Sequence, residues 1–117
     1  MYLNRRIDAA LLEWQRDPRH KPLLMRGARQ VGKTTAVRNL AQEFDNFVEI
    51  NLETDEEVKA FINRSFDIPG LLALIEIRYA TRIVPGRTLL FLDEIQRCPR
   101  AVTLLRYLYE QRQPLHV

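Results

Sequence analysis

Two glycines, a lysine and a threonine constrain the fold of this chain more than any other feature. Gly27, Gly32, Lys33 and Thr34 occupy every fixed position of the pattern G-x-x-x-x-G-K-[ST]. A short apolar run, residues 22–26, precedes the pattern, and apolar residues at helical spacing follow it. The pattern works only where a buried strand runs through a tight loop directly into a helix. The chain is therefore predicted to be an α/β protein.

The chemistry of this loop predicts phosphate binding. Its glycines let the backbone turn tightly and direct successive N–H groups at one anion, and the helix that follows directs its positive dipole end there. Lys33 reaches the β- and γ-phosphates, and the Thr34 hydroxyl ligates Mg²⁺. We therefore expect ATP with Mg²⁺ as the ligand. The expected nucleotide-binding residues are Gly27, Ala28, Arg29, Gln30, Val31, Gly32, Lys33, Thr34 and Thr35.

Hydrophobic periodicity predicts helices and strands in alternation along the rest of the chain. Residues 1–17 carry Leu3, Ile7, Leu11 and Trp14 at helical spacing, and a second helix follows the loop as far as residue 44. Residues 47–52 alternate as a strand does, and residues 89–92 form a fully apolar strand. Such alternation is typical of a mainly parallel sheet.

Capping residues set the expected bounds of three further helices. Thr54 or Asp55 caps a helix with Val58, Phe61 and Ile62, and Asp67 caps another that runs to Tyr79. Pro99 opens the third, which is predicted to direct inward the residues Val102, Leu104, Leu105 and Leu108. Residues 115–117 are predicted to be the first of another strand.

An acidic pair at the end of the apolar strand supplies the second part of the expected site. The strand delivers Asp93 and Glu94 to the carboxyl edge of a parallel sheet, where ligands bind. Asp93 is predicted to hold Mg²⁺ with Thr34, and Glu94 to act as the catalytic base on water, alongside Lys33. A glutamate directly after the aspartate favours a hydrolase over a small-molecule kinase.

These motifs resemble the N-terminal domain of bacterial and archaeal AAA-type ATPases. The likeness is carried by GARQVGKTT at residues 27–35 and by LDEIQ at residues 92–96, and it extends over nearly the whole chain. It implies a P-loop NTPase three-layer sandwich with a parallel sheet of strand order 5-1-4-3-2. It also implies ATP and Mg²⁺ as ligands, with Lys33, Thr34, Asp93 and Glu94 in the roles given above.

Measured against that family, the expected sheet is incomplete. Residues 1–117 are predicted to form one partial domain, with an N-terminal helix at 1–17 and the P-loop core at 22–117. In it the central fourth strand is only begun and the fifth strand is absent. Hydrolysis is expected of the full-length family and is expected to be impaired or absent in this truncated chain. Completion of the sheet by a protein partner or by a missing C-terminal portion is left open.

Two other functional classes stay open beside the ATPase module. A small P-loop kinase would need lid arginines, for which Arg97 and Arg100 are candidates, and a non-catalytic interaction fragment would dock on another chain. The formal net charge of +3 permits but does not indicate nucleic-acid binding. One cysteine, Cys98, and an N-terminus without a long apolar run predict a cytoplasmic protein without a membrane segment.

Overall fold

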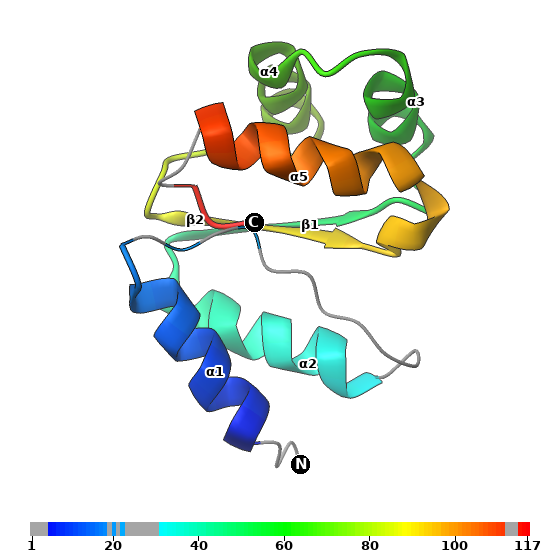
Figure 1. Ribbon diagram of the computed structural model, residues 1–117. Helices are drawn as coiled ribbons and strands as arrows, with labels where there is room; N and C mark the ends of the chain where they lie inside the picture. The colour runs from blue at the N-terminus through cyan, green and yellow to red at the C-terminus, as the bar shows by residue number, and fades with distance from the viewer. Residues whose placement is uncertain (1–4, 19, 21, 23–30, 112–114) are drawn as a thin grey trace.

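The protein is a three-layer arrangement of helices around a parallel sheet (Figure 1). The structure, a computed structural model, describes residues 5–18, 20, 22, 31–111 and 115–117, without the side chains of residues 5–8 and 31–33. The helices are α1 (Arg5–Arg16), α2 (Val31–Leu40), α3 (Glu56–Arg64), α4 (Ile68–Arg78) and α5 (Pro99–Gln111). The strands are β1 (Asn46–Asn51) and β2 (Thr88–Asp93), and single 3₁₀ turns are η1 (Ala41–Glu43) and η2 (Ile95–Arg97).

The strands pair in the order that the sequence predicts. β1 and β2 are parallel and in register from Asn46 opposite Thr88 to Asn51 opposite Asp93. On the other side of β2, His116 forms a parallel bridge with Leu89, so the residues expected to begin a strand do lie beside the acidic strand. These three segments follow the 4-3-2 portion of the expected order. The strand expected at 22–26 lies almost entirely outside the described residues.

Side chains point alternately to the two faces of the sheet along each strand, so the strands contribute to two separate hydrophobic cores. Leu90 and Ile50 face the layer of α3, α4 and α5, whereas Leu89 and Phe47 face α1 and α2. Figure 1 shows α3, α4 and α5 over one face of the sheet and α1 and α2 over the other. This two-sided burial explains why residues 89–92 are an unbroken apolar run, as strands buried on both faces are.

Local chemistry starts the helices where the sequence predicts. The Asp55 carboxylate accepts a hydrogen bond from Val58 N and the Asp67 carboxylate accepts one from Gly70 N, so both aspartates are N-caps. A Cβ added at Gly70 would meet the Asp67 carboxylate, so a larger residue there would displace the side chain that caps the helix. The predicted turn at Pro85–Gly86 is also present, with Gly86 at a φ of 82°.

One residue of α5 that is predicted to face inward is exposed instead, so this part of the prediction is wrong. Leu104 and Leu108 are buried together with Ala101, but Val102 is 41% exposed. Residues 101, 104 and 108 share a helical stripe, and at about 100° per residue Val102 lies roughly 200° from Leu104. The residues predicted to face inward thus include one, Val102, that lies on the solvent-facing side of α5.

Candidate nucleotide-binding edge

The described part of the phosphate loop is its helical end. α2 begins at Val31, so the backbone of Gly32, Lys33 and Thr34 forms the first turn of a helix, as the loop pattern requires. Thr34 and Thr35 are half-buried. Gly27, Ala28, Arg29 and Gln30, which are also expected to bind phosphate, lie outside the described residues.

The acidic pair lies at the carboxyl end of β2. Asp93 is the last residue of the strand. Leu52, which directly follows the neighbouring strand β1, donates from its N to Asp93 O at 2.9 Å and so holds this end of β2 in place. α2 begins and β2 ends on the same side of the molecule (Figure 1). The first turn of α2, which contains Thr34, and the carboxyl end of β2, where Asp93 is the last residue, thus lie towards the same side of the fold.

Glu94 has a backbone conformation that the sequence does not predict. Its φ of 56° and ψ of 44° place it in the left-handed region, which a residue with a side chain adopts rarely. Glu94 N donates to Asp93 Oδ1 at 2.9 Å, so the two neighbouring acids are linked. Strained residues of this kind concentrate at functional sites.

Gln96 is a further residue at this edge. Its Nε2 donates to Glu94 Oε1 at 2.6 Å, across a 3₁₀ turn that begins at Ile95. The contact orients the carboxylate that is expected to act on water. Only its spacing of two residues from Glu94 could have suggested this role, and that spacing is common in any chain.

A cross-link joins the loop helix to β1 beside the acidic pair. Arg38 donates from Nε and Nη2 to the two Glu49 carboxylate oxygens, at 2.9 Å and 2.8 Å. These hydrogen bonds and the charge of Glu49 raise the pKa of Arg38 against the opposing effect of desolvation, and Asp93 adds to the rise. The effect of Asp93 on Arg38 agrees with a close approach of α2 to the end of β2.

The oxygen donors at this edge fit Mg²⁺. A threonine hydroxyl and an aspartate carboxylate are hard oxygen ligands, and Mg²⁺ in such sites takes its other ligands from phosphates and water. Within residues 9–111 and 115–117, as far as their side chains are described, no group of three or more His, Cys, Asp or Glu forms a metal site.

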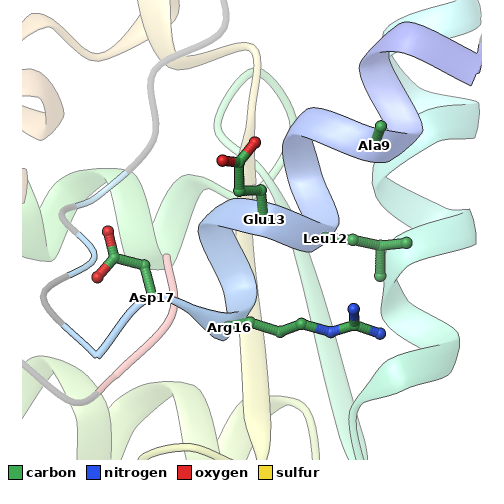
Figure 2. A pocket seen from close by; sticks show the side chains of 5 residues that line it. All are labelled: Ala9, Leu12, Glu13, Arg16 and Asp17. Carbon is green, nitrogen blue, oxygen red and sulfur yellow. The ribbon is translucent and has the colours of Figure 1, made fainter.

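An open hollow lies elsewhere, on α1. It has a volume of about 560 Å³ and is lined by Ala9, Leu12, Glu13, Arg16 and Asp17. Figure 2 shows these five side chains spread around one helix and the residue that follows it. The hollow contains none of the predicted nucleotide-binding residues. In the described ranges, no helix is both long enough and apolar enough to cross a membrane.

Comparison with known proteins gives one match. A family model described as an AAA domain matches residues 19–117, which include the phosphate loop, the acidic strand and the bridge at His116. The helix α1 precedes the matched range. No curated protein and no solved structure matches the chain.

Proposed function

Because this chain belongs to the AAA-domain ATPase family, we propose that it is a module that binds ATP with Mg²⁺ at the edge where α2 begins and β2 ends. The observation that supports the proposal is that both motifs lie inside the range of the family match, with the start of α2 and the end of β2 on the same side of the fold. The loop residues 27–35 bind the phosphates through backbone N–H groups and Lys33. Thr34 and Asp93 hold Mg²⁺, which neutralises phosphate charge when it is bound.

In the proposed reaction, Glu94 accepts a proton from water while the water oxygen attacks the γ-phosphorus. The bond from the γ-phosphorus to the bridging oxygen breaks, and ADP leaves with that oxygen. The hydrogen bond from Gln96 supports this role because it fixes one carboxylate oxygen of Glu94. ATP hydrolysis by this chain is a more specific proposal than ATP binding, and it is tested separately.

The positions of two arginines argue against a kinase lid. Arg100 Nε donates to Ile62 O at 3.0 Å, and the guanidinium lies 4.1 Å from the centre of the Phe66 ring. Arg97 pairs with Glu53 at 3.7 Å. Arg100 is thus engaged with the last turn of α3 and the segment after it, and Arg97 with the segment before α3.

The binding test is a titration of a fluorescent ATP analogue with Mg²⁺ against three forms of the chain. Lys33→Ala is expected to weaken affinity at least about tenfold, since one charge-assisted phosphate contact contributes about 1.4 kcal/mol or more. Lys59→Ala is the matched control, because Lys59 pairs with Glu56 on α3 and is expected to leave affinity unchanged. A well-folded wild-type chain that binds no nucleotide would refute the proposal.

A further inference from the structure

Two histidines far apart in the sequence stack directly on one another. The rings of His20 and His116 have centroids 3.7 Å apart and planes inclined by 9°. Both residues are buried, with 5% and 6% of their surface exposed. Trp14 lies edge-on to both rings, at 5.7 Å and 5.1 Å, and Phe44 lies edge-on to His116 at 5.1 Å. The two imidazoles therefore share a small aromatic enclosure away from the nucleotide edge.

His20 connects the end of α1 to the C-terminal residues. Its Nδ1 is 3.0 Å from Asp17 O and its Nε2 is 3.1 Å from Leu115 O. A carbonyl oxygen only accepts hydrogen bonds, so both contacts are satisfied together only when both ring nitrogens carry a proton. The arrangement around His20 is therefore complementary to the positively charged imidazolium.

The surroundings of His116, in contrast, favour the neutral imidazole. Its Nε2 lies 2.9 Å from Gln15 O and must donate, while its Nδ1 is buried without a hydrogen-bond partner. A proton on Nδ1 would bury an unsatisfied N–H and place a second positive charge against His20. Burial lowers the pKa of His116, the hydrogen bond to Gln15 opposes that effect, and the charge of His20 lowers it further.

Among the residues whose side chains the structure describes, the other charged groups near the pair are exposed to solvent. On the α1 side they are Glu13, Arg16 and Asp17, and on either side of Phe44 they are Glu43 and Asp45. Leu89, the β2 residue that bridges to His116, is apolar. Water screens the exposed charges, so the two rings are the groups that respond to each other's protonation.

We propose that the stacked His20–His116 pair is a proton-sensitive joint, closed by one positive charge and opened when His116 takes a second proton. Closed, it ties Gln15 and Asp17 at the end of α1 to Leu115 and His116 beside β2. The joint lies where β2 begins, at the opposite end of the strand from Asp93. The proposal does not depend on nucleotide binding.

On the α1 side of the joint, opening would act on the packing of α1 against α2. α1 packs on α2 through Leu11, which is buried among Ala36, Val37 and Leu40. Loss of the joint removes the hydrogen bonds that the two histidine rings make to Gln15 O and Asp17 O at the end of α1. On the other side of the sheet, the Leu115 side chain belongs to the core with α3, α4 and α5, so the joint also fixes the C-terminal residues against that core.

Trp14 makes the joint directly observable, because it is the chain's one tryptophan and contacts both rings. Its emission would be followed from about pH 8 to about pH 5, with far-UV circular dichroism at each step, in wild type and in His116→Gln. Glutamine keeps a neutral donor for Gln15 O but does not titrate. We expect a transition with a midpoint below 6.5, the ordinary histidine value, in wild type and none in the variant.

The Cε1 proton resonances of the two histidines, followed by NMR, identify the group that titrates. The midpoint of His116 is expected below 6.5 in the wild type and higher in His20→Gln, which removes the neighbouring charge. A His116 midpoint at or above 6.5, or an emission transition that survives in His116→Gln, would overturn the proposal. If His116→Gln does not fold, the wild-type midpoint decides by the same criterion.

Discussion

Replacing Asp55 by alanine is expected to destabilise the protein by about 3 kcal/mol. The Asp55 carboxylate, 5% exposed, joins the start of α3 to the end of α4. Its Oδ1 accepts from Val58 N at 3.1 Å and from Arg78 Nη2 at 3.0 Å, and its Oδ2 accepts from the Tyr79 hydroxyl and from Arg78 Nε at 3.3 Å. One side chain thus caps one helix and fixes the last turn of another.

The magnitude follows from the two contacts that are best shielded from water. Loss of an N-cap costs about 1 kcal/mol, and loss of a hydrogen bond between a neutral donor and a buried carboxylate costs about 2 kcal/mol. Arg78 is partly exposed and also pairs with Glu57 at 3.1 Å, so it retains a partner. A cost of about 3 kcal/mol is a large part of the roughly 5–15 kcal/mol that stabilises a domain.

Urea unfolding at neutral pH, followed by circular dichroism, measures the loss. A double-mutant cycle with Tyr79→Phe isolates the hydroxyl contact, whose coupling energy with Asp55 is expected to exceed about 1 kcal/mol. Asp55→Asn is the matched control, since its amide oxygen can still accept from Val58 N and it should lose less than alanine does. A loss below about 1 kcal/mol in Asp55→Ala would refute the argument, because the cap alone accounts for that amount.

Further predictions concern Tyr79, the core and the site. Burial and the hydrogen bond to Asp55 raise the pKa of Tyr79 to about 12. The Tyr79 hydroxyl therefore stabilises the folded protein fully below pH 10.0, its ordinary pKa, and this stabilisation is lost as pH rises towards 12. An ultraviolet titration of the phenol groups should show this high-pH ionisation in the wild type and lose it in Tyr79→Phe. Leu104→Ala, at 1% exposure, should cost about 2–5 kcal/mol in urea unfolding, against less than about 1 kcal/mol for Val102→Ala. Glu94→Gln should retain nucleotide affinity and lower phosphate release at least about tenfold, and unchanged release would exclude Glu94 as the base.

Helix starts and strands could be predicted because they depend on neighbours in the sequence. Asp55 and Asp67 cap helices through N–H groups three residues away, so residue type and spacing suffice. The acidic end of β2 was predictable for a similar reason, since an apolar run ends directly at Asp93. Val102 is the exception, because apolar character alone does not fix the side of the helix on which a residue lies.

The histidine joint could not be predicted because it is formed by tertiary contacts alone. The hydrogen bond between His20 and Leu115 spans 95 positions, and the sequence shows only two histidines near prolines. The left-handed backbone of Glu94 was equally hidden, because a glutamate gives no local indication of a positive φ. Both features depend on how the ends of the strands are packed.

The two ends of β2 thus carry different kinds of chemistry, and α2 links them. At the carboxyl end, Asp93 and Glu94 lie at the proposed nucleotide edge, and the first turn of α2 belongs to the same edge. At the amino end, Leu89 pairs with His116, and the α1 helix that this joint holds packs against the later turns of α2. If the joint opens as proposed, we therefore expect the change to reach α2 through the packing of Leu11 against Ala36, Val37 and Leu40.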